Sequence, residues 1–296
     1  MAARLEVCAA AFLFSLGGAG IKATELTSWQ VACFRSGIAA LMFLLFIPEA
    51  RRGWSWRSLV VGTTYAATMI FFVLANKLTT SANTIFLQSA APLYVLLLAP
   101  WLLHERGKRS DLPVMALVVV GLSLFFIGSE APLRTAPDPF RGNLLGAAAG
   151  VTWALTIMGM RRLGRSGGSA PLSAALAGNC IAMAVALPFA LPVTNAGPAD
   201  AGIIVGLGVV QIGLAYVFLI RGLRDVPAFE AMILLLLEPA LNPVWSWIVH
   251  GERPGAWSLL GGALILGASV LKTWNDSRIA VKRGQPAPEV DPPAPS

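Results

Sequence analysis

Apolar residues gather in long stretches along this chain, separated by short segments that carry most of the charge. Crossing a bilayer as a helix takes roughly 20 mostly apolar residues, with every backbone polar group paired inside the segment. Ten stretches meet that length, which predicts an all-α integral membrane protein with ten transmembrane helices. They cover about 4–22, 28–47, 58–76, 81–103, 111–128, 142–160, 171–191, 200–220, 228–249 and 256–274.

One motif occurs twice. Pro92 is followed thirteen residues later by Glu105-Arg106, and Pro239 is followed at the same spacing by Glu252-Arg253. Five predicted helices in each half is an odd number, so the second half must enter the bilayer upside down relative to the first. The pattern therefore predicts two inverted five-helix repeats. This architecture is typical of secondary transporters, whose substrate site lies near the midplane between the halves.

The repeat also sets the expected domain boundaries. We assign residues 1–128 to the first five-helix repeat, 129–141 to an external connection and 142–274 to the second, inverted repeat. Residues 275–296 are polar and then rich in proline, with too little apolar content to pack. We expect them to form a disordered cytoplasmic tail.

Basic residues lie mainly at the ends of the predicted helices. If the N-terminus is cytoplasmic, sixteen of the 22 lysines and arginines face the cytoplasm and five face outward, while Arg35 falls within a helix. Positive charge favours the cytoplasmic side of a membrane. We therefore expect both termini in the cytoplasm, the connection near Thr135-Ala136 outside, and the turn from Arg161 to Ser166 inside.

The composition excludes most soluble classes. The chain is 56% hydrophobic and 12% charged, with a mean hydropathy of +0.70, whereas globular domains carry about 25% charged residues. A net charge of +7 would suggest nucleic acid in a soluble protein, but here the membrane topology accounts for it. We expect the lipid bilayer as a partner and no nucleic acid.

Signals for an enzyme are weak. His104-Glu105 resembles the start of a zinc-protease motif, but Lys108 occupies the place of the required second histidine. The three cysteines lie singly within predicted helices, without the spacing of a metal site. We therefore expect no catalytic residues, no metal and no cofactor.

Two ionisable residues fall within predicted helices, where such residues are costly and often functional. Glu238 directly precedes Pro239, which removes a backbone donor and should open or kink the helix. Glu238 could carry a proton or contact a substrate ammonium, or it could only satisfy freed carbonyls. Arg35 could act in gating, reach the interface, pair with Glu25 or receive a substrate carboxylate.

Polar and aromatic residues at mid-depth predict a central cavity. Pro92 and Pro239 hold matched repeat positions, and we assign them, with Arg35, to gating and helix bending. The predicted substrate-binding residues are Ser15, Tyr65, Gln88, Tyr94, Trp153, Tyr216 and Glu238.

Several short motifs carry a family resemblance over about residues 4–274. They are the run from Phe14-Ser-Leu-Gly to Lys22, its equivalent from Thr152-Trp-Ala to Arg161, Phe34-Arg-Ser-Gly, and Leu237-Glu-Pro-Ala followed by His250-Gly-Glu-Arg. In order and spacing they resemble the drug/metabolite transporter superfamily, specifically EamA-type proteins, and within it the bacterial exporters of aromatic amino acids. The first half departs from this pattern by having Ala91 where the second has Glu238.

The resemblance implies a secondary transporter in the bacterial inner (cytoplasmic) membrane. It would export a small-molecule substrate, an amphipathic metabolite such as an aromatic or hydrophobic amino acid, by alternating access. We expect it to work as a monomer. Two alternatives remain open from the sequence: efflux of cationic or nucleotide-related compounds, and a membrane-embedded lipid-modifying enzyme.

Overall fold

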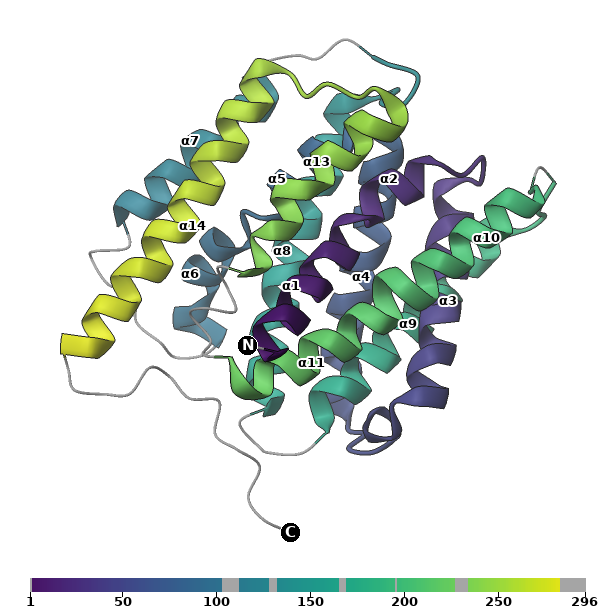
Figure 1. Cartoon of the computed structure of the whole chain (residues 1–296), viewed down its shortest axis with the longest axis horizontal. Coiled ribbons are helices and arrows are strands. Elements are labelled where there is room, and N and C mark those ends of the chain that lie inside the picture. Colours follow the sequence, from purple (N-terminus) through teal and green to yellow (C-terminus); the bar gives the residue numbers. More distant parts are fainter. Residues whose placement is uncertain are drawn as a thin grey trace.

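The computed structural model describes residues 2–102, 112–127, 132–164, 169–194, 196–226 and 234–282. Regular structure in these ranges is helical, apart from an isolated bridge between Leu133 and Ala136 (Figure 1). The helices are α1 (Ala2–Ser15), α2 (Gly17–Lys22), α3 (Ser28–Phe46), η1 (Pro48–Arg51), α4 (Trp56–Leu78), α5 (Ser81–Gln88), α6 (Ala91–Leu102), α7 (Leu112–Ile127), α8 (Pro139–Gly164), α9 (Ala170–Ala190), α10 (Pro198–Gly206), the π-helix η3 (Leu207–Leu214), α11 (Ala215–Asp225), α13 (Leu237–His250) and α14 (Ala256–Lys282).

Seven described helical segments are long and apolar enough to cross a membrane. They are Ala2–Lys22, Ser28–Phe46, Trp56–Leu78, Ser81–Leu98, Pro139–Gly164, Ala170–Ala190 and Pro198–Leu219. Leu112–Ile127 and Ala256–Lys272 are apolar but shorter, and α13 has 14 residues. The all-α membrane class is confirmed, whereas ten crossings remain a prediction.

Three of the predicted spans are broken near their middle. A turn at Leu16 separates α1 from α2, Ser89 and Ala90 separate α5 from α6, and α13 starts afresh after a turn at Leu236. The last two breaks precede Pro92 and Pro239, because a proline lacks the N–H that would bond the preceding turn. The helix therefore opens next to Glu238, as the Glu-Pro pair predicts.

The helix contacts between the two halves form a symmetric set. Helix α1 packs on α11 and on α13, while α4 and the α5–α6 pair both pack on α8. The equivalent helices α3 and α9 pack on each other, as do α7 and α14, which run side by side in Figure 1. Swapping the two halves converts each of these contacts into another contact that is also present. The predicted two-fold relation between the halves would give this set of contacts, and the inverted repeat stays a prediction.

Small residues let these helices approach closely, which is how membrane helices commonly pack. A Cβ placed on Gly121 of α7 would come within 2.9 Å of the carbonyl oxygen of Gly261 in α14. Between α4 and α8, the hydroxyl of Thr68 donates to Thr152 at 3.0 Å, and Thr156 donates to Thr64 at 3.0 Å. Packing and hydroxyl pairs thus hold the two halves together in an apolar surrounding.

The C-terminal helix is longer than predicted. Helix α14 continues to Lys282, past the expected end of the last span at residue 274. Residues 275–282 continue the backbone hydrogen-bonding pattern of α14, and a disordered cytoplasmic tail stays a prediction. The remaining tail, 283–296, lies outside the described residues, as do Glu105 and Arg106 of the repeated motif.

Candidate functional site

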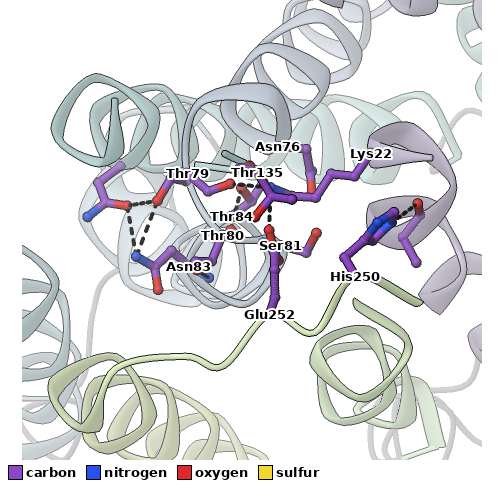
Figure 2. Close-up of polar contacts among 12 residues, drawn as sticks. Lys22, Asn76, Thr79, Thr80, Ser81, Asn83, Thr84, Thr135, His250 and Glu252 are labelled. Carbon is purple, nitrogen blue, oxygen red and sulfur yellow. Dashed lines mark hydrogen bonds and ion pairs between the residues drawn. The ribbon is translucent and has the colours of Figure 1, made fainter. Parts of the chain in front are cut away.

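A buried ion pair joins the two halves at one end of the bundle. Nζ of Lys22, the last residue of α2, lies 2.7 Å from Oε1 of Glu252, and the two side chains are only 2% and 3% exposed. The ammonium also donates to the carbonyl oxygen of Thr79 at 2.8 Å and to that of Thr135 (Figure 2). Lys22 thereby contacts residues near the ends of other spans that lie far from it in the sequence.

Local structure places Glu252 opposite Lys22. Helix α13 ends at His250 and is capped by Gly251, whose positive φ of 67° allows a left-handed turn. The Glu252 carboxylate then accepts a bond from the backbone N–H of Ser81 at 3.1 Å, at the start of α5. A helix N-terminus has unpaired N–H groups and a positive dipole end, so a carboxylate is stabilised there.

A neutral hydrogen-bond network continues from this pair. The Thr79 hydroxyl donates to Oδ1 of Asn143 at 2.8 Å, and Nδ2 of Asn83 donates to the same oxygen at 3.2 Å. Nδ2 of Asn143 in turn donates to the carbonyl oxygen of Phe125 at 2.9 Å. Nε2 of His250 lies 2.9 Å from the carbonyl oxygen of Ala19. These bonds link α2, α5, α7, α8 and α13 around the ion pair. Figure 2 shows Thr79, Asn83 and His250 around Lys22 and Glu252.

A second cluster, of aromatic and polar side chains, lies deeper in the bundle. The rings of Tyr65 in α4 and Tyr216 in α11 have centroids 6.4 Å apart, and Tyr216 makes edge contacts with Phe14 and Phe43 at 5.4 and 5.6 Å. Nδ2 of Asn179 donates to the Tyr65 hydroxyl at 3.4 Å. We call these five residues the aromatic cluster. It draws side chains from both halves, because Asn179 and Tyr216 belong to the second.

Ser15 lies next to this cluster, at the break between α1 and α2. Its hydroxyl donates to the carbonyl oxygen of Phe12 at 2.6 Å and accepts a bond from Nε1 of Trp245 at 2.9 Å. Phe12 packs edge-on against Trp245, with centroids 5.6 Å apart. Nε2 of Gln211, in the π-helix, donates to the carbonyl oxygen of Phe14 at 3.4 Å. The bond from Gln211 reaches a carbonyl at the break and so supports the discontinuous helix.

The two charged residues predicted within spans, Arg35 and Glu238, both lie near the aromatic cluster. The Tyr216 hydroxyl lies within electrostatic range of both the Arg35 guanidinium and the half-buried Glu238 carboxyl group. Arg35 is 1% exposed, and its Nη2 donates to the carbonyl oxygen of Met69 at 3.4 Å. Five of the predicted residues, Ser15, Arg35, Tyr65, Tyr216 and Glu238, are therefore brought to one region.

The remaining predicted site residues lie along α8. The Tyr94 ring would come within 3.2 Å of a Cβ built on Gly150, which also faces Gln88 across the same crossing. Trp153, half-buried, lies one turn further along α8. No described contact joins these three side chains to the aromatic cluster. Pro92 lies in the first turn of α6, and Pro239 is buried in α13.

Sequence reasoning did not identify the Lys22–Glu252 pair as part of the site. The signal was present, since Glu252 belongs to the repeated Glu-Arg motif and Lys22 ends a motif of the family resemblance. An apolar crevice of about 500 Å³ lies elsewhere, between α3, α9 and α10, and is lined by residues such as Phe34, Met183 and Ile204. It contains almost no polar surface, so we do not assign the substrate to it.

Multi-pass membrane transporters commonly have apolar helices of spanning length, buried polar contacts between their two halves, and polar or ionisable side chains near a site between the halves. The model of the EamA-like transporter family matches the chain in two segments, residues 3–127 and 140–274. The chain belongs to the EamA-like transporter family.

Named relatives are also transporters. The pseudopaline exporter CntI of Pseudomonas aeruginosa strain UCBPP-PA14 is 24% identical over 88% of this chain and 92% of its own length. The same exporter from strain PAO1 is 25% identical over 88% and 92%. An uncharacterized transporter of Archaeoglobus fulgidus is 27% identical over 71% of this chain and 73% of its own. A crystal structure resembles the fold with a TM-score of 0.61 at 20% identity, covering 94% of this chain and 98% of the other.

Proposed function

We propose that this protein exports small amphipathic metabolites, above all aromatic and hydrophobic amino acids, by alternating access between two inverted five-helix halves. The observation that carries the proposal is the aromatic cluster, which is built from both halves and lies near a buried arginine and a glutamate. We further propose ten crossings, a monomeric transporter and no cofactor.

The chemistry of the cluster suits such cargo. An aromatic side chain can pack edge-on or offset against Tyr65, Tyr216 and Phe14, each pair contributing roughly 0.5–1.5 kcal/mol. The carboxylate of Glu238, beside the opened helix, is a partner for a substrate ammonium. We place Gln88, Tyr94 and Trp153 on the far wall of the same cavity. Binding is expected to be weak, because an exporter must also release its cargo.

Alternating access requires each end of the bundle to close in turn. We propose that the Lys22–Glu252 pair closes the external end in the conformation described here. The helix breaks before Pro92 and Pro239 and at Leu16 would allow the outer halves of these spans to move separately from the inner halves. Breaking the pair would then be part of each transport cycle.

We propose that the protein lies in the bacterial inner membrane with both termini in the cytoplasm. Single cysteines at Arg52 and Arg134, both exposed, test this in a variant lacking Cys8, Cys33 and Cys180. A membrane-impermeant maleimide should label Arg134→Cys in intact cells and Arg52→Cys only after permeabilisation. The reverse pattern would place the charged turns on the wrong side and contradict the topology.

Substrate selectivity tests the role of the aromatic cluster. Replacing Tyr216 by alanine removes a ring that touches three others, and it should weaken transport of phenylalanine and tryptophan about tenfold, which corresponds to roughly 1.4 kcal/mol. Transport of leucine should change much less, because leucine does not use the ring face. Uptake of radiolabelled amino acids into proteoliposomes measures both.

Two further variants control this experiment. Tyr216→Phe keeps the ring and should retain most aromatic transport, and Trp247→Ala removes an aromatic side chain that is 54% exposed and should have little effect. Equal losses of leucine and tryptophan transport in Tyr216→Ala would mean that the ring supports the fold and does not select the cargo.

The names of the Pseudomonas relatives favour a second candidate, export of pseudopaline or a similar compound. A competition assay in the same proteoliposomes, with the twenty amino acids and pseudopaline against labelled phenylalanine, separates the two. Stronger competition by pseudopaline than by any aromatic amino acid would favour the second candidate.

A further inference from the structure

In the part of the chain that the structure describes, Arg35 is a buried cation without a carboxylate partner. It is 1% exposed, and among the residues that the structure describes no carboxylate oxygen lies within 4.0 Å of it. Its Nη2 has only the Met69 carbonyl oxygen at 3.4 Å and the Met69 sulfur at 3.6 Å, and its Nε has no hydrogen-bond partner. A guanidinium stays protonated in proteins, so Arg35 cannot lose its charge to relieve this burial.

Buried charges are normally paired, because an unpaired one keeps most of its desolvation cost. Lys22 follows that rule: it has Glu252 and two carbonyl oxygens. Arg35 departs from it, although it lies on α3 beside Tyr65 and Tyr216, where the proposed cargo would bind. The contrast between the two cations indicates that Arg35 is arranged to receive an anion that comes and goes.

We propose that Arg35 forms the carboxylate-binding subsite of the transport cavity. This rests on the proposed function and narrows it, since the cargo must then carry a carboxylate. The fork of N–H donors on a guanidinium matches the two oxygens of a carboxylate. Arg35 on α3 and Glu238 on α13 both act electrostatically on Tyr216, so a zwitterion would place its carboxylate at Arg35 and its ammonium at Glu238. Amines without a carboxylate would leave Arg35 unpaired and would be rejected.

The test measures ligand-induced thermal stabilisation of the purified full-length protein, because a ligand that binds the folded state raises its melting temperature with concentration. Four probes vary one group at a time: phenylalanine, phenylalanine amide, phenethylamine and leucine. Wild-type protein should respond to phenylalanine and leucine, and at least about thirtyfold more weakly to the amide and the amine, as expected when a buried charge loses its partner.

Variants at Arg35 provide the second arm. Arg35→Gln should lose at least about thirtyfold in apparent affinity for phenylalanine and leucine, and Arg35→Lys should recover part of it by restoring the charge without the fork. Arg141→Gln changes an arginine whose side chain is 78% exposed and should match the wild type. If Arg35→Gln does not fold, the wild-type comparison of phenylalanine with its amide decides.

The outcomes separate the subsite from the proposed cargo. Equal binding of phenylalanine and phenethylamine by the wild type, a folded Arg35→Gln with unchanged affinity for phenylalanine, or no response to either carboxylate ligand overturns the subsite. Binding of leucine that depends on Arg35, without any binding of the aromatic probes, supports the subsite and contradicts the aromatic cargo. Equal binding of phenylalanine and phenethylamine that depends on Tyr216 contradicts the subsite and supports the aromatic cargo.

Discussion

Replacing Glu252 by glutamine should lower the free energy of unfolding by roughly 3–5 kcal/mol, because it leaves the Lys22 ammonium buried without a counter-charge. The side chain keeps its size, so packing changes little and the loss reports the charge. Lys22→Met should have a smaller effect, since Glu252 keeps the backbone N–H of Ser81 as a partner. Chemical or thermal unfolding of the detergent-purified variants measures both.

The double variant Lys22→Met/Glu252→Gln should regain at least half of the lost stability, because no unpaired charge remains. It should still transport poorly, since the external end no longer closes. The matched control is the exposed pair of Arg141 and Asp138, 3.3 Å apart with side chains 78% and 36% exposed. Asp138→Asn should cost at most about 1 kcal/mol. Wild-type stability in Glu252→Gln would contradict the buried pair, and normal transport in the double variant would contradict its role in closure.

Alanine at Gly178 should destabilise the protein by roughly 1–3 kcal/mol through overpacking. A Cβ at this position of α9 would lie 2.5 Å from Cδ1 of Tyr65 and 2.8 Å from the carbonyl oxygen of Gly62, so both α4 and the tyrosine must shift. Because Tyr65 belongs to the aromatic cluster, transport of aromatic amino acids should fall as well. Unfolding and proteoliposome uptake measure the two effects.

Gly202→Ala is the control, and it should raise the free energy of unfolding where Gly178→Ala lowers it. Gly202 lies in α10 with no atom within 4 Å of an added Cβ, so alanine should stabilise that helix by up to about 1 kcal/mol. If Gly178→Ala were as stable as Gly202→Ala, close contact between α4 and α9 would not be required for the fold.

Local features of the sequence were sufficient for the class and for two of the three helix breaks, those before Pro92 and Pro239, whereas the break at Leu16 was not predicted. A bilayer satisfies no backbone polar group, so each long apolar stretch has to be helical, and helices lie on every predicted stretch. Pro92 and Pro239 act on their own turns, which is why breaks before them could be predicted. The extension of α14 to Lys282 could not be predicted, because polar residues after a span are compatible both with a continued helix and with its end.

Which side chains meet was decided by the tertiary structure. Lys22 pairs with Glu252 across 230 positions of the chain, and Trp245 bonds Ser15 across a similar distance. Such contacts depend on the rotation of each helix about its axis and on where two helices cross. A stretch that is apolar on all sides specifies neither the rotation nor the crossing point. For the same reason the predicted cavity residues divided into the group around Tyr216 and the group along α8. The sequence by itself thus determined a helical membrane protein with interrupted spans. The packing of its helices decided that Lys22 has a carboxylate partner and that Arg35 has none among the described residues.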